Sequence, residues 1–464
     1  MRNEGRPNER LLASARTPRR RPLAASLPIG ALAVVALMLA GCGGAAPKER
    51  IVLITLDTLR FDSLAGVEGS PTTMPRLRSF AERGLSFERF YSASATTQPS
   101  HASLFTGLHP WQHGVVRNGC LLAPELDTLA ERLDAVGFET AATVASFAVH
   151  SRFGFDQGFE RYDDDFSIEL ETGKDRWMGH DLEDAFYSLA PDVTEKALAL
   201  LDSMSEGRQF LWVHYYDPHT PYGDTAGTPF DLMDLRANLV ARPSFADQTI
   251  ARGRSLYDED VSILDRELGR LLERIERESD VYETHVVLVS DHGESFGESN
   301  SLGHGNRLTP EQVRVPMVLM SPRVRPGVRR DIGGMVDLYP TLLALAGITG
   351  VPSRGRDLLA TSEGFAYGMR RLPAKGVVRE VRADGTTVEH VGPRFFIALE
   401  DGLVTGDGEH LFADDEREPT LADDVADDVR RLFATFADEL DGGDVRALDD
   451  EETVQALGAL GYGE

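Results

Sequence analysis

One segment near the start of the chain restricts the fold more than any other. Ile51–Leu56 is an almost unbroken run of apolar side chains that ends in Asp57. A strand with apolar residues at both odd and even positions has both faces buried, as in a parallel sheet covered by helices on each side. The run Val286–Ser290 repeats this pattern and ends in Asp291 and His292. The chain is therefore expected to build a buried sheet with acids at its strand ends.

A third apolar run and several amphipathic segments extend the pattern. The run is Phe210–His214, and the segments that predict helices are Leu126–Val136, Val193–Met204, Tyr257–Ile275 and Val336–Leu345. Strands that alternate with helices predict an α/β fold with a doubly wound, mostly parallel sheet flanked by helices.

The pattern changes at about residue 351. Short alternating segments such as Val377–Arg382 and Phe395–Leu399 predict a small antiparallel sheet. The acidic stretch Ala422–Leu440 predicts a helix packed on that sheet. We therefore expect a principal domain over residues 50–350 and a C-terminal subdomain over residues 351–464.

The first 41 residues predict an export signal. They hold seven arginines and two glutamates, and an apolar stretch, Leu27–Leu39, leads into Leu39-Ala40-Gly41-Cys42. This ending resembles the lipobox of bacterial lipoproteins, with Cys42 as the lipidated first residue and residues 42–49 as a tether. We expect an exported protein, anchored to the bacterial envelope only through the lipid on Cys42. A plain signal peptide with a chance cysteine is the alternative.

The charge of the chain excludes some classes of partner. The formal net charge is −27, and removing the seven arginines and two glutamates of residues 1–41 makes it −32. Such an acidic chain is a poor partner for nucleic acid. No apolar run of 20 residues occurs after residue 50, which excludes an integral membrane transporter.

The strand ends predict a metal site. In doubly wound sheets ligands bind beyond the carboxyl ends of the strands, where Asp57, Asp291 and His292 fall. Carboxylate and imidazole ligands without a thiolate suit Ca, Zn, Mn or Mg. The spacing of Thr97 and Pro99 predicts that Thr97 opens a helix, where backbone N–H groups and the helix dipole favour an anion. A hydroxyl there becomes a good nucleophile when a metal lowers its pKa.

Residues 51–348 resemble the sulfatase branch of the alkaline phosphatase superfamily. The motifs that coincide, in the family's order, are Leu56–Arg60, Pro99–Gly107, His113–Val115, Leu129–Glu131, His214–Tyr222, Ser290–Glu294, Gly303–Gly305 and Val336–Leu343. The resemblance implies an alkaline phosphatase-like fold, a divalent metal and an ester hydrolase whose catalytic domain is residues 50–350.

The chain departs from the sulfatase pattern at the nucleophile. Sulfatases carry Cys or Ser, converted to formylglycine, at the position of Thr97, and Arg at the position of His101. Threonine cannot become formylglycine. The pattern Thr-x-Pro-x-His instead resembles the nucleotide pyrophosphatase/phosphodiesterase branch, in which a metal-bound threonine attacks phosphorus.

That second likeness assigns roles to individual residues. Thr97 is the expected nucleophile, and the expected metal ligands are Asp57, Thr97, Asp291 and His292. Asn118 is expected to stabilise the equatorial oxygens of the reacting group.

Four histidines complete the expected site. His219 and His304 are expected to contact the substrate or its leaving group, and are placed with Thr97 among the catalytic residues. His101 and His214 are placed with Asn118 in substrate binding, although His101 could equally orient the nucleophile helix and His214 could be structural. We expect one divalent metal ion; a second one, held by Asp217, His219 and His304, is a further alternative.

These assignments favour hydrolysis of phosphate or phosphonate esters by in-line attack of metal-bound Thr97. One alternative is a sulfuric ester hydrolase that works without formylglycine, and another is a non-catalytic envelope binding protein. The substrate is expected to be a small-molecule, glycan or lipid ester. The strongly negative charge favours small or neutral-bodied esters.

Overall fold

The structure is a computed structural model. It describes residues 48–65, 73–169, 185–223, 246–298, 301–305, 307–361, 366–370, 378–381, 387–390, 393–399, 402–406, 411–413 and 423–442. The described residues form one compact unit. The predicted export signal, Cys42 and most of the predicted tether lie outside the described residues, and the predicted boundary at residue 350 stays a prediction.

The central element is a sheet of eight described strands. Their order across the sheet is β12 (Gly327–Gly334), β2 (Leu85–Tyr91), β11 (Met317–Met320), β8 (Glu283–Ser290), β1 (Glu49–Leu56), β7 (Arg208–Tyr215), β3 (Phe138–Thr143) and β4 (Arg161–Asp163). Within the described part β11 is antiparallel to both neighbours, and the other adjacent pairs are parallel. The predicted doubly wound, mostly parallel sheet is confirmed.

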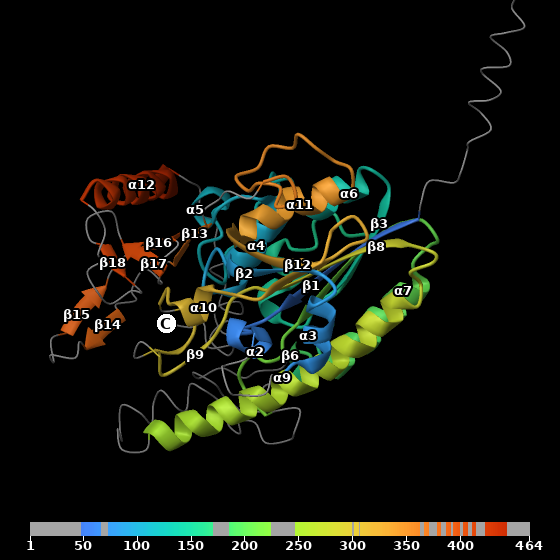
Figure 1. Ribbon diagram of the computed structural model, residues 1–464, viewed down its shortest axis with the longest axis horizontal. Helices are drawn as coiled ribbons and strands as arrows, with labels where there is room; N and C mark the ends of the chain where they lie inside the picture. Colours follow the sequence, from blue (N-terminus) through green and yellow to red (C-terminus); the bar gives the residue numbers. More distant parts are fainter. Residues whose placement is uncertain are drawn as a thin grey trace, which may run out of the picture. The chain divides into compact units, whose positions relative to one another are not determined.

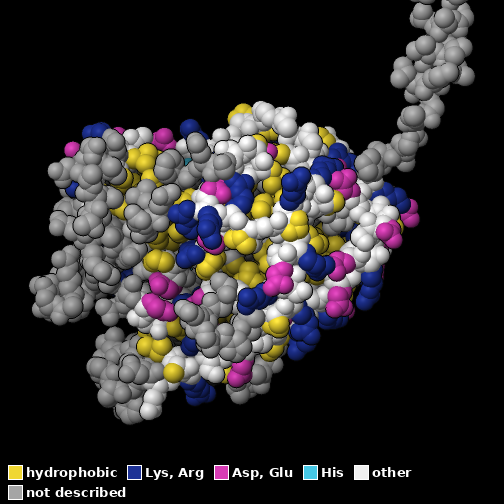
Figure 2. All heavy atoms as spheres, viewed as in Figure 1, with side chains coloured by type: hydrophobic (Ala, Val, Ile, Leu, Met, Phe, Trp, Pro, Cys, Tyr) yellow, Lys and Arg dark blue, Asp and Glu magenta, His cyan; other side chains and the backbone are white. Residues whose placement is uncertain are grey.

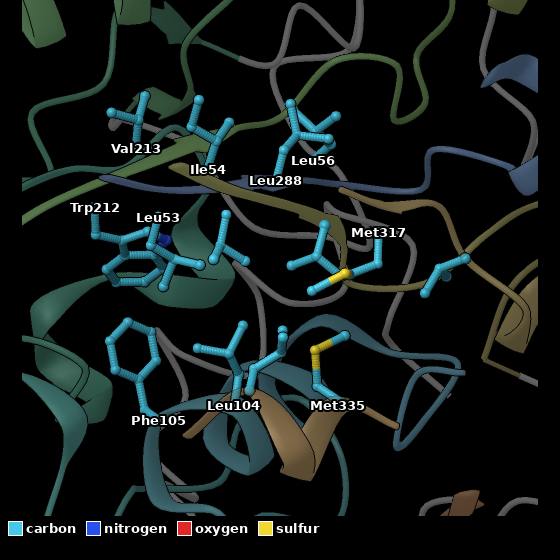
Figure 3. Close-up of a cluster of buried hydrophobic side chains, with 14 of the residues drawn as sticks. Leu53, Ile54, Leu56, Leu104, Phe105, Trp212, Val213, Leu288, Met317 and Met335 are labelled. Atoms are coloured by element: carbon cyan, nitrogen blue, oxygen red, sulfur yellow. The ribbon is translucent and has the colours of Figure 1, made fainter. Parts of the chain in front are cut away.

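The middle strands are apolar on both faces because both faces are covered. Along β1 the side chains of Leu53 and Ile54 point to opposite sides of the sheet, as successive residues of a strand must. Figure 3 shows Leu53 and Trp212 facing Phe105 of the helix below the sheet, while Ile54 lies on the other side. All of these side chains are buried.

Helices cover the two faces of the sheet (Figure 1). One face carries α4 (Thr97–Thr106), α6 (Leu129–Asp134) and α11 (Leu338–Leu345), which contact one another. The other carries α3 (Pro75–Ala81), α7 (Ala190–Ser203) and α9 (Ala246–Glu276). Short helices α2 (Phe61–Ala65), α5 (Pro110–His113) and α10 (Pro310–Val313) lie in the connections.

Several helix starts differ from the prediction. Helix α7 begins at Ala190 rather than Val193, and α11 begins at Leu338 rather than Val336. Helix α6 begins at Leu129 rather than Leu126, because the Thr128 side chain accepts the Glu131 N–H and the Glu131 side chain accepts the Thr128 N–H. Helix α9 begins at Ala246, well before the predicted Tyr257. Its first turns are polar, so an apolar stripe could not reveal them.

The C-terminal part holds the predicted antiparallel sheet. Four strands pair in the order β13 (Ala366–Arg370), β16 (Arg394–Leu399), β17 (Gly402–Gly406) and β18 (Leu411–Ala413). The predicted strand near Val378 is β14 (Val378–Val381), which pairs only with β15 (Thr387–His390) among the described strands.

The predicted acidic helix is α12 (Asp423–Gly442), and it has two neighbours rather than one. It contacts β16, as expected, and also α5. Trp111 of α5 stacks on Phe436 of α12 with ring centroids 4.1 Å apart, and Trp111 Nε1 donates to Glu439 Oε2 at 3.1 Å. These contacts join α12 to α5, which in turn contacts α4 beside the central sheet.

The described surface mixes both signs of charge. On the face shown in Figure 2, basic and acidic side chains are intermingled, with small apolar areas between them. No helix in the part of the chain that the structure describes is both long and apolar enough to cross a membrane.

Candidate active site

Three predicted residues meet at the carboxyl edge of the central sheet. Asp57 follows β1, and Asp291 and His292 follow the neighbouring strand β8, whose Ser290 is in register with Leu56. One ligand atom of each of the three residues lies within 4.8 Å of the others, and all three are buried. His292 Nε2 lies 3.7 Å from Asp57 Oδ1 and 3.6 Å from Asp291 Oδ2. We call Asp57, Asp291 and His292 the ligand trio.

The trio has the chemistry of a cation site. Both carboxylate oxygens of Asp57, and Oδ2 of Asp291, are buried without a hydrogen-bond partner among the described residues. Burial raises the pKa of Asp57 well above its usual range, and the charges of Asp291 and Glu294 add to this. Burial likewise raises the pKa of Asp291. Buried carboxylates of like charge require a cation or a proton between them, so these residues fit a divalent metal.

His292 is held in the tautomer that a metal ligand needs. Its Nδ1 lies 3.0 Å from the carbonyl oxygen of Gly293, which can only accept, so Nδ1 carries the hydrogen. Nε2 therefore presents its lone pair toward the two carboxylates. Burial lowers the pKa of His292 well below its usual range, so the ring is neutral.

The backbone beside the trio is strained. Thr58 has φ of 55°, which β-branched residues rarely adopt. In this conformation the Thr58 N–H donates to Asp291 Oδ1 at 3.2 Å, as the His292 N–H does at 2.6 Å. Strained residues of this kind cluster at functional sites, where the surrounding structure holds them.

Thr97 opens α4, as predicted. Thr96 is the N-cap residue in an extended conformation, and Thr97 Oγ1 lies 3.4 Å from His292 Nε2. Ser100, one turn further on, donates through Oγ to the carbonyl oxygen of Asp291 at 2.7 Å. The helix start is thereby fixed against the ligand trio.

Hydrogen bonds of Asn118 and Gln98 connect the start of α4 to residues 118–120. Asn118 Oδ1 accepts the backbone N–H of Gln98 at 2.9 Å, and Gln98 Oε1 accepts the N–H groups of Gly119 and Cys120 at 2.7 and 3.1 Å. Because the two oxygens are used in this way, the Asn118 Nδ2 and Gln98 Nε2 amides keep their hydrogens, and neither has a partner in the described part. An amide donor is thus available beside Thr97 for an oxyanion.

His101 and His214 are stacked and buried, with ring centroids 5.0 Å apart. His101 Nδ1 donates to the Thr97 carbonyl at 2.9 Å, and its Nε2 lies 3.1 Å from Thr55 Oγ1. His214 Nε2 lies 3.9 Å from Asp57 Oδ2. The hydrogen bonds of His101 suit the orientation of α4; that either histidine binds substrate stays a prediction.

The two remaining histidines lie over the trio. The His304 ring is 4.5 Å from that of His292 and 5.0 Å from that of His219, centroid to centroid. His219 Nδ1 donates to the Thr220 carbonyl at 2.6 Å, and burial lowers the pKa of His219 to about 3. Both residues predicted to contact the substrate are thus placed beside the ligand trio.

Asp217 serves a different purpose from the one considered for it. Its Oδ2 accepts the backbone N–H of Ala190 at the start of α7, at 2.8 Å. Among the described residues the ligand trio is the one group of acids and histidines close enough to share an ion. The alternative of a second metal at Asp217, His219 and His304 therefore gains no support.

Three residues of the site received no role from the sequence: Gln98, Tyr222 and Glu294. Gln98 lies inside the motif around Thr97 but received no role. Glu294 is fully buried; its Oε1 lies 3.1 Å from His304 Nδ1, and its Oε2 accepts from the Tyr222 hydroxyl at 2.8 Å. The Asp-His-Gly-Glu run was the available signal for Glu294, although its contacts join segments far apart in sequence.

The geometry agrees with a comparison against protein families. The family model described as Sulfatase matches residues 49–348, which include every residue of the site. The chain belongs to the sulfatase family. It is accordingly a hydrolase that acts on ester bonds, and the predicted membership of the alkaline phosphatase superfamily is confirmed.

Individual relatives of this sulfatase-family protein are distant. A choline-sulfatase of Rhizobium meliloti (strain 1021) is 24% identical over 354 residues, which cover 65% of this chain and 68% of the relative. The phosphonate monoester hydrolase SpPMH from Silicibacter pomeroyi has a similar structure, with a TM-score of 0.62 at 18% identity, over 84% of this chain and 95% of that one. BT4656, in complex with its substrate D-glucosamine-2-N,6-O-disulfate, gives a TM-score of 0.61 at 17% identity, over 86% and 99%. These structures show the shared fold.

Proposed function

We propose that the protein is a metal-dependent hydrolase of phosphate or phosphonate esters, with Thr97 as its nucleophile. The observation that carries the proposal is the placement of the Thr97 hydroxyl. It lies at the start of α4, 3.4 Å from His292 and beside two buried acids that fit a divalent metal. The residue is a threonine, which cannot form the aldehyde that sulfatases use.

Asp57, Asp291 and His292 would hold the metal, and Thr97 Oγ1 is its further expected ligand. When bound, the metal neutralises negative charge on the ester and lowers the pKa of a coordinated hydroxyl. Thr97 Oγ1 attacks phosphorus in line with the leaving oxygen and forms a phosphothreonine, and water then releases the product. The α4 N-terminus and the Asn118 Nδ2 donor face the charge that develops on the other oxygens.

The histidines near Thr97 do little to neutralise the charge of a bound anion. Burial holds the pKa of His219 near 3 and that of His101 near 4, so both rings are neutral at neutral pH. Neutral imidazoles add little positive charge to a bound anion. This favours esters with a single negative charge, such as phosphodiesters and phosphonate monoesters, over dianionic phosphate monoesters.

Hydrolysis of sulfate esters is the second candidate. The family match favours it, and the choline-sulfatase and the disulfate-bound relative are named for sulfate substrates, one small and one a sugar. The phosphonate monoester hydrolase favours the first candidate to the same degree. A sulfate monoester also carries a single charge, so the electrostatics described above do not separate the two.

Matched substrates and a matched pair of variants test the nucleophile. We expect Thr97→Ala to lower kcat on a 4-nitrophenyl phosphonate or phosphodiester by at least about 10³-fold while the bound-metal content changes little. Thr106→Ala, at the other end of α4, removes a buried hydroxyl whose partners among the described residues are Ala102 O and Leu108 N, and should keep the wild-type rate. Full activity of Thr97→Ala would exclude Thr97 as the nucleophile, and a higher kcat/KM on 4-nitrophenyl sulfate would favour the second candidate.

We further propose that the protein is exported and held at the envelope by a lipid on Cys42. The basic start, the apolar stretch and the Leu-Ala-Gly-Cys ending support this. Metabolic labelling with a radioactive fatty acid tests it: label should appear in the wild-type chain and be absent from Cys42→Ser. An unlabelled wild-type chain would contradict the lipid anchor.

A further inference from the structure

Glu294 forms a buried network that the mechanism above does not use. Its side chain is fully buried, with Oε1 3.1 Å from His304 Nδ1 and Oε2 2.8 Å from the Tyr222 hydroxyl. Its carbonyl oxygen accepts from Arg60 Nη1 at 2.7 Å, which fixes the backbone as well. Both carboxylate oxygens and the main chain of Glu294 are therefore held in place.

The network determines which nitrogen of His304 carries a hydrogen. Glu294 Oε2 accepts from the Tyr222 hydroxyl, and Oε1 faces His304 Nδ1 at 3.1 Å. A carboxylate oxygen in this position accepts, so His304 Nδ1 carries the hydrogen. In the neutral ring Nε2 is then the nitrogen with the lone pair.

The His304 ring lies close to other residues of the candidate site. His304 lies 4.5 Å from the ring of His292, which contacts Thr97 Oγ1, and 5.0 Å from the ring of His219. The His304 side chain is 8% exposed, whereas Glu294 behind it is fully buried. The imidazole thus contacts the fixed carboxylate at Nδ1 and lies beside the rings of His292 and His219.

We propose that Glu294 is a positioning residue that acts through His304. Its carboxylate holds the imidazole in one orientation with Nδ1 protonated, so that Nε2 exchanges the proton with the leaving group and with water. The proposal rests on the proposed function, since it assigns a partner to one of the residues expected to contact the leaving group.

The proton balance has two halves. As Thr97 Oγ1 bonds to phosphorus, its proton passes through solvent to the lone pair of His304 Nε2. Nε2 gives this proton to the leaving oxygen when the phosphorus–oxygen bond to the leaving group breaks. In the second half water bonds to phosphorus and gives a proton to His304 Nε2. The bond from phosphorus to Thr97 breaks, and Oγ1 regains a proton from Nε2 through solvent, which leaves the ring neutral again.

A double-mutant cycle tests whether Glu294 acts through His304. We expect Glu294→Ala to lower kcat on a 4-nitrophenyl phosphonate by about 10–100-fold, as loss of a partner that orients a site histidine commonly does, with KM changed less than about threefold. In a His304→Ala background the same change should alter kcat less than about twofold. An equal loss in both backgrounds, or full activity of Glu294→Ala, would overturn the proposal.

Two further variants separate positioning from folding and charge. Glu294→Gln keeps an oxygen that accepts from His304 Nδ1 and should retain more of kcat than Glu294→Ala; equal losses would contradict a role through that hydrogen bond. Glu267→Gln, the matched control, removes another buried acid, one that pairs with Arg266 and Arg270 on α9 instead of with a histidine, and should keep the wild-type kcat. Unfolding temperature and metal content, measured for each variant, identify any chain that fails to fold.

The same assay distinguishes failure of the proposed function from failure of the inference about Glu294. If Thr97→Ala is active, the proposed function fails whatever the Glu294 variants do. If Thr97→Ala is inactive and Glu294→Ala has the wild-type kcat, the proposed function stands and the inference about Glu294 alone fails.

Discussion

The two ends of β1 differ in how their buried charges are paired. At the amino end, Glu49 accepts from Arg208 Nη2 and from Arg323 Nη2, each at 2.6 Å. Next to it, Arg50 pairs with Glu278, also at 2.6 Å. At the carboxyl end, neither oxygen of Asp57 has a hydrogen-bond partner among the described residues.

The difference is one of charge balance. At the amino edge acids and bases alternate, so each buried charge has an opposite charge beside it. At the carboxyl edge two acids of the ligand trio share a site, and the histidines around them are neutral because burial lowers their pKa. Uncompensated charge lowers stability, and a fold keeps it where a ligand compensates for it. The amino edge therefore stabilises the protein, and the carboxyl edge prepares it for a ligand.

Asp57→Asn gives the largest expected effect and tests the comparison at the carboxyl edge. Loss of a trio carboxylate should lower kcat by at least about 10³-fold and remove the metal-dependent rise in unfolding temperature. In a chelator, however, the free energy of unfolding should rise by about 1–2 kcal/mol, because a buried charge without a partner has been removed. Urea unfolding in a chelator, beside an activity assay, measures both. A fall in stability would contradict the proposed division between the edges.

Glu49→Gln is the matched change at the amino edge, with the opposite expected sign. It leaves Arg208 and Arg323 without their shared acid, and the free energy of unfolding should fall by about 1–2 kcal/mol. The arginines are partly exposed, which keeps the loss below that of a fully buried pair. Because Glu49 lies at the far end of the strand, kcat should stay within about twofold of wild type. A large loss of kcat in a folded variant would break the comparison.

The amino edge should also respond to pH, through a single buried histidine. Burial lowers the pKa of His285 to about 4, with a contribution from the Arg323 charge. The unfolded chain, with a pKa near ~6.5, takes up the proton first as the pH falls. The contribution of His285 to the free energy of unfolding is therefore constant above pH ~6.5. It is lost as the pH falls toward 4, and the loss is about 1–2 kcal/mol at pH ~5.

His285→Gln provides the control for this titration. Urea unfolding between pH ~7 and ~5 should show a shallower loss of stability for the variant than for wild type. Equal slopes would mean that His285 does not carry the response.

The strands of the fold were predictable where burial alone determines the pattern. β1, β7 and β8 have helices over both faces, so their sequences are continuous apolar runs and could be located within a few residues. The antiparallel direction of β11 could not be predicted, since Met317–Met320 is apolar whichever way it runs. Direction depends on the connections around a strand and not on its own side chains.

Some residues of the candidate site could likewise be predicted from the sequence, and others could not. Asp57, Asp291, His292 and Thr97 follow strands or open a helix, and the topology of a parallel sheet brings such positions together. The roles of Gln98, Tyr222 and Glu294 depend on hydrogen bonds between segments as distant as residues 222 and 294. Neither the spacing of residues nor the composition indicates such contacts, so these roles could be assigned only from the three-dimensional structure.

The length of β1 separates the two edges of the sheet electrostatically. At about 3.3 Å per residue, the eight residues Glu49–Leu56 separate the amino edge of the sheet from Asp57 by about 25 Å. Over that distance two unit charges interact by only about 0.7 kcal/mol at an effective dielectric constant of ~20. The ion pairs of the amino edge can therefore change with little effect on the electric field at the ligand trio.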